Sequence, residues 1–167
     1  MTCTSYKSQI TNHKRGFTLV ELLVVVGVLG ILASLALVSY TGAQKQGRDT
    51  QRKSDLKQYQ TALEIFANKN SSLYPSRTTT VNASGTFCST DLSLTVCPED
   101  PRNSEDATYV YNYQSNGTGA GSVDATQYVL WSKLENPDTT TYFVLCSTGA
   151  AGEATSGIPP TGGVCPL

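Results

Sequence analysis

The sequence predicts an α+β protein in which one long N-terminal helix, at about residues 18–70, packs on a small antiparallel sheet of three to four strands. Three observations lead to this fold class. The chain has 167 residues, which is enough for one domain. Residues 17–38 are apolar apart from a single charge, and no proline occurs before Pro75. Three short segments with strand patterns follow in the second half of the chain.

The first half of the predicted helix is long enough to cross a membrane. A bilayer core of roughly 30 Å needs about 20 helical residues, and the only charge within residues 17–38 is Glu21. A core helix of this length would normally show a polar face. A secretory signal peptide is the other alternative, because residues 1–16 are basic and residues 41–43 are small. The apolar region of a signal peptide is usually only about 7–15 residues long, which is shorter than the apolar run here. We therefore predict a transmembrane segment at residues 17–40.

The second half of the predicted helix, residues 41–70, changes character along its length. Residues 44–55 have no apolar face, and residues 44–70 hold six basic and three acidic groups. Such a basic face could bind DNA or anionic lipid, but we favour a face that is solvated or paired with neighbouring subunits. An apolar stripe then appears at helical spacing and predicts the seat of the sheet. Its members are Leu56, Tyr59, Leu63 and Phe66.

The remaining residues, 71–167, predict a small globular head. Residues 71–108 are rich in turn formers, and we expect loops there. Strand patterns follow at residues 108–114, 127–134 and 141–147, and turn-forming residues separate them. Short connections between consecutive strands favour an antiparallel meander, followed by a glycine-rich tail.

The five cysteines are distributed unevenly about the apolar segment. Cys3 precedes it, and the other four lie in the predicted head. An even number of cysteines in a small head favours disulfides, which need an oxidising compartment, so we expect the head to lie outside the cytoplasm. Four cysteines allow three pairings. We favour the two that close short loops, Cys88–Cys97 and Cys146–Cys165, each of which stabilises by roughly 3 kcal/mol in the chain-entropy model.

The residue types argue against catalysis and against a bound metal or cofactor. His13 is the only histidine in the sequence and precedes the apolar segment. The expected disulfides would remove thiol nucleophiles, and zinc is disfavoured because the sequence has no C-x-x-C pair and no histidine after His13. Four acidic residues, Glu99, Asp100, Glu105 and Asp106, have the oxygen ligands that Ca²⁺ prefers. Their spacing matches no calcium-binding loop, and we interpret them as a solvated acidic loop. We therefore predict no enzyme activity, no metal site and no cofactor.

Residues 14–37 read KRGFTLVELLVVVGVLGILASLAL. This segment resembles the class III signal of type IV pilins and type II secretion pseudopilins. The resemblance rests on a short basic leader, a glycine, an aromatic residue, a glutamate four residues later and an apolar helix. It implies that residues 1–16 are a leader peptide, which a prepilin peptidase removes between Gly16 and Phe17 on the cytoplasmic face. It also implies N-methylation of Phe17.

The resemblance also implies that Glu21 neutralises the Phe17 amine during filament assembly. The helix dipole favours a carboxylate in the first turn. Near the membrane interface, inserting the charged Glu21 costs less free energy than the roughly 2.5–3.5 kcal/mol quoted for a charge at the centre of a membrane helix. Among packed apolar helices a lone charge needs a positive partner, and leader cleavage creates one. Gly30 and Ser34, four residues apart, offer a surface for close helix contact.

These observations lead us to expect a structural subunit of a type IV pilus-like filament. Before assembly it would span the cytoplasmic membrane once with its N-terminus inside, and afterwards it would lie in an extracellular filament. Two alternatives remain: a pseudopilin of a type II secretion or DNA-uptake machine, and a membrane-anchored extracellular binding domain that does not polymerise. The expected partners are other copies of this chain, the prepilin peptidase, the pilus assembly machinery and the membrane. Binding to DNA is possible but has no support in the sequence.

Overall fold

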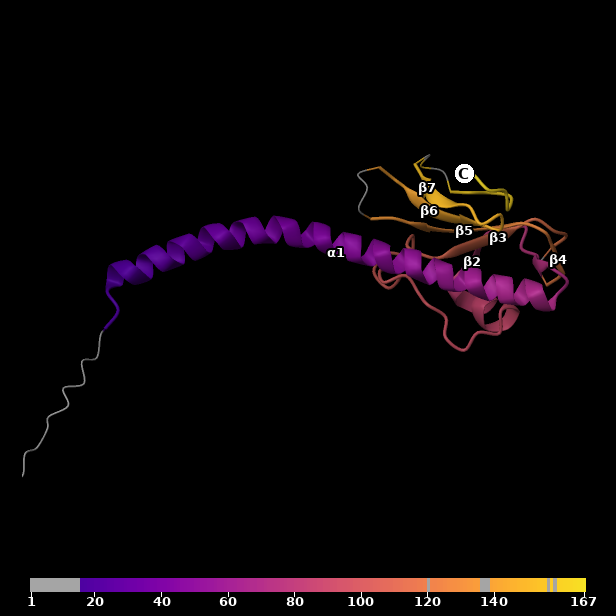
Figure 1. Cartoon of the computed structure of the whole chain (residues 1–167), viewed down its shortest axis with the longest axis horizontal. Coiled ribbons are helices and arrows are strands. Elements are labelled where there is room, and N and C mark those ends of the chain that lie inside the picture. The colour runs from indigo at the N-terminus through magenta and orange to yellow at the C-terminus, as the bar shows by residue number, and fades with distance from the viewer. Residues whose placement is uncertain (1–15, 120, 136–138, 156, 158) are drawn as a thin grey trace, which may run out of the picture. The chain divides into compact units, whose positions relative to one another are not determined.

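The computed structural model describes residues 16–119, 121–135, 139–155, 157 and 159–167. The chain divides into two units, residues 1–40 and residues 41–167. One helix, α1 (Leu19–Lys69), contributes to both units, close to the predicted bounds (Figure 1). The predicted leader lies outside the described residues, apart from Gly16.

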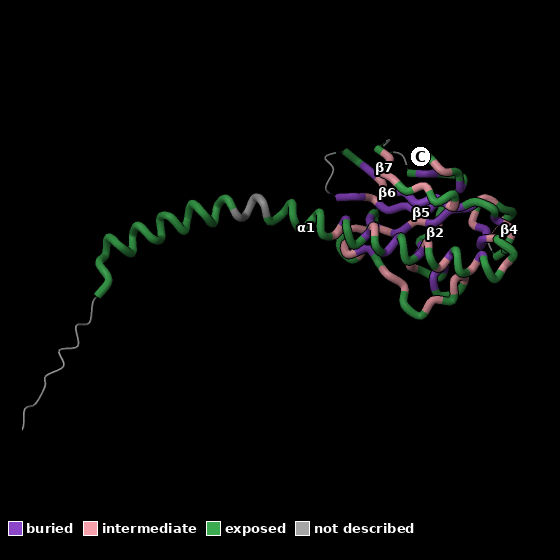
Figure 2. Tube along the Cα trace, in the orientation of Figure 1, coloured by how far each residue is buried: buried purple, intermediate pink, exposed green. Residues whose placement is uncertain are grey.

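In the first unit, apolar side chains surround α1 on every side. The large apolar side chains between Phe17 and Leu35 are 51–85 % exposed, and this part of the chain is green throughout in Figure 2. A helix that is apolar all round normally lies in a membrane or in the core of a larger assembly. Among the described residues, α1 is the one helix that is long and apolar enough to cross a bilayer.

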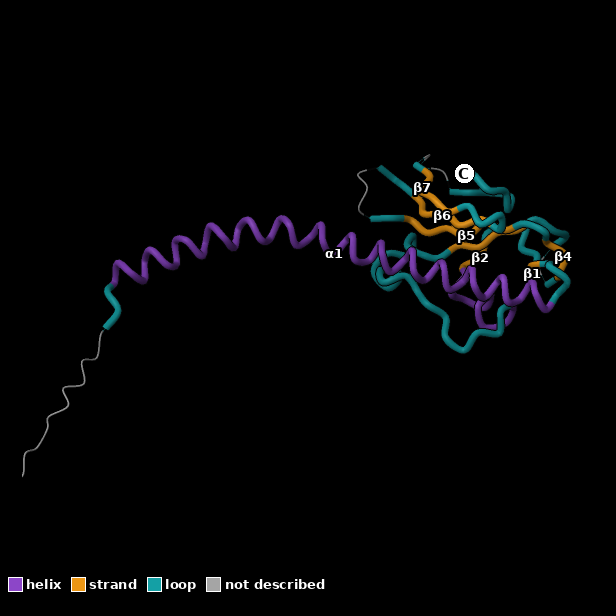
Figure 3. The backbone as a smooth tube through the Cα atoms, in the orientation of Figure 1, coloured by secondary structure: helices purple, strands orange, loops and turns teal. Residues whose placement is uncertain are grey.

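In the second unit, a five-stranded antiparallel sheet has the strand order β2-β3-β5-β6-β7. A separate two-stranded sheet pairs β1 with β4. Figure 3 shows the strands in orange beside the second half of α1. The strands are β1 (Tyr74–Pro75), β2 (Val81–Asn82), β3 (Asn112–Ser115), β4 (Val123–Ala125), β5 (Tyr128–Lys133), β6 (Tyr142–Cys146) and β7 (Ala151–Ala154).

The α+β fold class is confirmed, and the three predicted strands form the middle of the main sheet as β3, β5 and β6. The sheet is wider than predicted, because β2 and β7 add a short strand at each edge. Neither β2 nor β7 shows a strand pattern in the sequence. Val81–Asn82 lies in a threonine- and serine-rich tract, and Ala151–Ala154 lies in the glycine-rich tail. Pairing with a central strand supplies the backbone hydrogen bonds that these segments need.

The prediction of loops throughout residues 71–108 was wrong in part. Besides β1 and β2, this region contains a short helical segment with wide turns, η1 (Ala83–Asp91), whose backbone is not helical at Gly85. Phe87 and Cys88 of η1 are buried, and Cys88 is disulfide-bonded to Cys97. The segment is thus held by side-chain burial and by a covalent bond to the loop that follows it.

The main core lies between α1 and the sheet. Leu56, Tyr59 and Leu63 are fully buried, as the stripe predicted, but Phe66 is only half-buried and Ala67 continues the buried face in its place. The main sheet contributes Tyr113, Tyr128, Leu130, Phe143 and Leu145 to this core, and the rings of Tyr113 and Tyr128 stack on one another. Tyr59 meets Tyr111 edge-on, with ring centroids 6.1 Å apart.

The opposite face of the sheet is also covered. Val129, Trp131 and Val144 form a second buried cluster, against which Cys165 packs. The disulfide Cys146–Cys165 ties this covering segment to β6. Burial on both faces explains why β5 is a continuous buried run rather than an alternating one.

Candidate assembly site and the charged cluster of the head

The N-terminal end of α1 is closed by a reciprocal pair of side chains. Glu21 Oε2 accepts hydrogen bonds from the backbone nitrogen of Thr18 (2.9 Å) and from Thr18 Oγ1 (2.7 Å). In return, the backbone nitrogen of Glu21 donates to Thr18 Oγ1 at 3.3 Å. This arrangement is a capping box, which satisfies backbone donors that the first helical turn leaves open. Within one chain, therefore, Glu21 already stabilises the start of α1.

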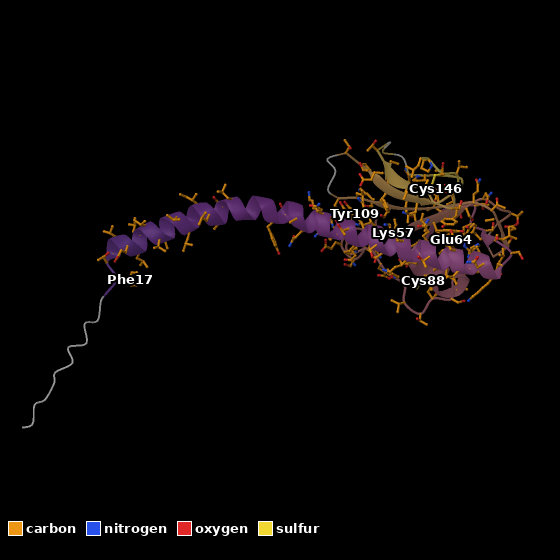
Figure 4. The ribbon with its side chains drawn as sticks, in the orientation of Figure 1. Phe17, Lys57, Glu64, Cys88, Tyr109 and Cys146 are labelled. Atoms are coloured by element: carbon orange, nitrogen blue, oxygen red, sulfur yellow. A yellow bond between two sulfur atoms is a disulfide. The ribbon has the colours of Figure 1, made fainter. Side chains whose placement is uncertain are left out.

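Thr18 is a residue that the sequence interpretation did not single out. Its signal is present, because a threonine followed three residues later by a glutamate, just before an apolar run, marks a helix start. Gly16 and Phe17 lie immediately before the helix, and Phe17 is 85 % exposed. Figure 4 labels Phe17 at this end of α1. The predicted cleavage position is thus in an accessible, non-helical part of the described chain.

The two small residues named as a contact surface are both exposed on α1. A methyl group added at Gly30 would meet no atom within 4 Å beyond its chain neighbours and the backbone of its own helix. The Ser34 hydroxyl donates to the backbone oxygen of Ile31 at 2.7 Å, which satisfies it within its own helix. Both positions are compatible with the close approach of another helix, and their role in assembly stays a prediction.

In the head, a buried arginine of α1 gathers carboxylates from three segments. Arg52 is 0 % exposed. Its Nε and Nη2 donate to the two oxygens of Asp100 at 2.6 and 2.8 Å, and its Nη1 donates to Asp49 at 2.7 Å. Its Nη2 also lies 2.6 Å from Glu135 Oε1. These bonds outweigh the cost of burying the guanidinium and raise the pKa of Arg52 above its ordinary value.

A second arginine of α1 binds the same carboxylate from the solvent side. Arg48 forms a two-pronged bond to Glu135, with distances of 2.8 and 2.6 Å. Burial alone would raise the pKa of Glu135. The hydrogen bonds from Arg48 and Arg52 dominate, however, and lower that pKa to about 2. Glu135 is therefore ionised at neutral pH and joins the end of the main sheet to α1.

The charged cluster is completed by an aromatic ring. The guanidinium groups of Arg52 and Arg102 each lie 4.7 Å from the centre of the Tyr109 ring. Such cation–π contacts contribute about 0.5–2 kcal/mol, depending on burial. The cluster thus unites α1, the segment around Asp100 and the chain after β5 around one buried guanidinium.

The interpretation of Glu99, Asp100, Glu105 and Asp106 as one solvated acidic loop was wrong for Asp100. Asp100 is buried and bound to Arg52, whereas Glu99 and Glu105 are exposed. Its sequence neighbours gave no hint of this, because its partner lies 48 residues away. Within the described residues, no group of three or more acidic, histidine or cysteine side chains is arranged to hold a metal ion.

Three of the basic side chains in residues 44–70 form ion pairs within the head. Arg48 and Arg52 bind head carboxylates, and Lys53 Nζ lies 2.7 Å from Glu153 Oε1 of β7. Half of the six basic groups in this stretch are thus paired within the chain. This pairing weakens the case for a DNA-binding surface on α1, because DNA affinity requires cations that are available to phosphates.

Two further carboxylates of α1 accept hydrogen bonds from core tyrosines. Asp55 Oδ2 accepts from the hydroxyl of Tyr111 at 2.7 Å, and Glu64 Oε1 accepts from the hydroxyl of Tyr128 at 2.9 Å. Burial raises the pKa of both tyrosines, and the nearby carboxylates raise it further. These bonds satisfy buried hydroxyl groups and position α1 on the sheet.

Comparisons with known proteins agree with the geometry of the N-terminal segment. A family model described as the prokaryotic N-terminal methylation motif matches residues 11–37. This match covers residues 14–37, the segment on which the resemblance to prepilin-type N-termini rests.

Three curated proteins align with this chain over more residues than the motif covers. The type IV major pilin protein PilA of Myxococcus xanthus is 37 % identical over 59 residues, or 35 % of this chain and 27 % of that protein. Fimbrial protein Q of Moraxella bovis is 27 % identical over 115 residues, which cover 69 % of each chain. The type II secretion system core protein G of Dickeya chrysanthemi is 30 % identical over 108 residues, which cover 65 % of each chain.

The resemblance to type IV pilins and type II secretion pseudopilins is therefore confirmed. The chain covers less than a third of the Myxococcus protein and under two thirds of the Dickeya protein. No solved structure matches the chain.

Proposed function

We propose that this chain is the structural subunit of a type IV pilus-like filament. The observation that carries the proposal is the prepilin-type motif in front of a helix whose apolar side chains are exposed all round. Exposed apolar surface of this extent is unstable in water. A membrane covers it before assembly, and neighbouring copies of the same helix cover it in a filament.

In this proposal, processing and assembly are coupled through charge. Removal of residues 1–16 creates a positive amine at Phe17, and Glu21 of an adjacent copy neutralises it within the helix bundle. A buried unpaired charge is costly, so uncleaved subunits would assemble poorly. Glu21 has two successive roles: it caps its own helix through Thr18 in the free subunit, and it binds a neighbour in the filament.

The head would lie outside the cytoplasm, where its disulfides can form and persist. The proposed function requires polymerisation and no catalysis. The proposed partners are the prepilin peptidase, the assembly machinery, the membrane and other copies of the chain. No metal or cofactor enters the proposal.

The decisive experiment has two parts. The intact mass of the purified mature chain should correspond to residues 17–167 with a methylated N-terminus. A chain that begins at Met1 or near Gln44 would contradict cleavage after Gly16. Electron microscopy should then detect filaments that contain the mature chain, identified by mass spectrometry. Mature, membrane-bound protein that never enters a filament would favour the membrane-anchored binding domain.

A pseudopilin is the second candidate. The observation in its favour is the alignment with core protein G, which extends over 65 % of this chain and therefore into the head. Deletion of the gene distinguishes the two candidates. Loss of surface filaments with normal protein secretion supports the pilus subunit, whereas loss of secretion without loss of surface filaments supports the pseudopilin.

A further inference from the structure

Residues 159–167 form a strap over the second face of the main sheet, the face that points away from α1. Val129, Trp131 and Val144 of that face are buried, and Cys165 of the strap packs against them. Trp131, for example, is only 2 % exposed. The burial of this second apolar cluster therefore depends in part on the strap staying in place.

Two close contacts seat the strap on the sheet. Gly163 is buried, and a methyl group added there would lie 2.4 Å from the backbone carbonyl carbon of Ser115 and 2.5 Å from the backbone nitrogen of Asn116. Only glycine allows two backbones to approach so closely. Figure 1 marks the C-terminal end of the chain beside β7. There, a methyl group added at Gly152 would lie 3.2 Å from the side chain of Leu167.

The strap has few other ties to the head. Among the described residues, no backbone hydrogen bond joins residues 159–167 to the sheet, whereas the edge strands β2 and β7 are both held by backbone pairing. Segments with few backbone hydrogen bonds open at a lower free energy than the strands beneath them. The disulfide Cys146–Cys165 is therefore the strongest restraint on the strap.

We propose that the strap is a redox-sensitive device, which covers Val129, Trp131 and Val144 while Cys146 and Cys165 are bonded and opens by itself when they are reduced. Thiol–disulfide exchange closes it, because an oxidised dithiol takes up the two electrons and two protons that the cysteines lose, and a reduced dithiol reverses the exchange. The core between α1 and the sheet stays folded, since it contains no residue of the strap.

This device makes the second face of the sheet complete only after the disulfide has formed. An open strap exposes apolar side chains, and such a patch favours association between heads. The compartment in which the strap closes rests on the proposed function, because that function places the head outside the cytoplasm. The opening itself is a property of the head and needs no filament.

Two glycine variants of the full chain, solubilised in detergent, test the seat. Gly163→Ala should lift the strap, because the added methyl group collides with the backbone of Ser115. Gly162→Ala is the matched control. Its φ of +72° is close to the +68° of Gly163, so both variants carry the same strain in the left-handed region. Gly162, however, is exposed, and a methyl group there meets no atom within 4 Å beyond its chain neighbours.

The fluorescence of Trp131, the only tryptophan, reports the opening without denaturant. In Gly163→Ala its emission should shift to longer wavelengths, and acrylamide should quench it several times more strongly than in the wild type. Gly162→Ala should behave as the wild type does. Equal exposure of Trp131 in both variants would assign the effect to backbone strain and overturn the seat.

Removal of the disulfide tests the redox control. Cys146→Ser/Cys165→Ser should expose Trp131 and keep the far-ultraviolet circular dichroism of the folded head. Cys88→Ser/Cys97→Ser is the control and should leave Trp131 shielded, because Cys88 and Cys97 pack with the other core cluster. Dithiothreitol should expose Trp131 in the wild type and in this control, and should change nothing in Cys146→Ser/Cys165→Ser.

Two results would overturn the proposal. One is a Trp131 that remains as shielded in Cys146→Ser/Cys165→Ser as in the wild type. The other is exposure of Trp131 that is accompanied by loss of the circular dichroism signal, because the head would then unfold as one unit. A wild-type chain that shows the expected opening but never forms filaments would count against the proposed function alone.

Discussion

The two units of the chain treat charge and apolar surface in opposite ways. In residues 16–35, the large apolar side chains are exposed and the single carboxylate, Glu21, bonds only to its own helix start among the described contacts. In residues 41–167, most large apolar side chains are buried and even an arginine is fully enclosed, because Asp49, Asp100 and Glu135 surround it. In the head, contacts within one chain bury apolar side chains and pair the buried charges. In the first half of α1, contacts within the chain leave the large apolar side chains exposed.

This difference separates folding from assembly. The head can fold as an individual subunit, because its core, its disulfides and its buried ion pairs join residues of the same chain. The large apolar side chains of the first half of α1 are exposed, so in the proposed function a membrane or other subunits cover them. Variants in the two units should therefore fail at different steps, and the following predictions are ordered from the largest expected effect to the smallest.

The largest expected effect is on assembly. Glu21→Ala should leave insertion and cleavage intact but abolish filaments, because an unpaired buried amine costs on the order of 3–5 kcal/mol. Glu21→Gln is the informative companion, since glutamine can still complete the capping box with Thr18 but carries no charge. The measurement is a count of filaments after cleavage has been verified by mass. Normal filaments from cleaved Glu21→Gln would assign the glutamate to helix capping alone.

Arg52→Ala should be the most damaging single change in the head. It leaves Asp49, Asp100 and Glu135 without their shared cation, and breaking a buried pair costs about 3–5 kcal/mol. Trp131 is the only tryptophan and is buried in the head, so its fluorescence reports head unfolding in detergent-solubilised mature chain. The conservative control Arg52→Lys keeps the charge but loses the forked geometry and should fall between wild type and alanine. An unchanged denaturation midpoint for Arg52→Ala would mean that the cluster does not stabilise the head.

Removal of the second disulfide should cost somewhat less. Replacing both Cys146 and Cys165 by serine opens a loop of 19 residues, for which the chain-entropy model predicts a loss of about 3 kcal/mol. The same replacement of Cys88 and Cys97 opens a shorter loop, with a separation of 9 residues, and should cost less. Non-reducing peptide mapping of the wild-type chain must first recover these two pairs. Free thiols there would reject the oxidising compartment.

Acid should weaken the head over a defined pH range. The pKa of Glu135 falls from its ordinary 4.5 to about 2 on folding, so its contribution to stability is fully present above pH 4.5. The contribution is lost as the pH falls through that range toward 2, because the unfolded chain then binds the proton first. Chemical denaturation monitored by Trp131 at several pH values should show this slope, and Glu135→Gln should flatten it. A slope that is identical in the two proteins would assign the acid sensitivity to other carboxylates.

The smallest effect is expected for the exposed ion pair. Lys53 and Glu153 are each more than a third exposed as side chains, and exposed pairs contribute about 0.2–1 kcal/mol. Lys53→Ala should therefore shift the denaturation midpoint only slightly, and high salt should remove the difference. A loss as large as that of Arg52→Ala would contradict the distinction between buried and exposed pairs in the head.

Much of the local structure follows from the sequence alone. The apolar run, the absence of early proline and the stripe at Leu56, Tyr59 and Leu63 predict α1 almost to its ends, because helical periodicity is a local property. The central strands are likewise visible in their residue types. The motif at residues 14–37 also determines the family resemblance and the candidate residues Gly16, Phe17 and Glu21.

Only the tertiary structure decided which charges are buried and which short segments become strands. Asp100 has acidic neighbours and looks solvated in the sequence, yet it is enclosed because Arg52 arrives from another segment. The two-residue strand β2 exists only because β3 offers an edge to pair with. Both outcomes depend on partners far away in the chain. A local sequence pattern reflects the structural preferences of neighbouring residues. Ion pairs and strand pairs between distant residues form only when folding brings their segments into contact.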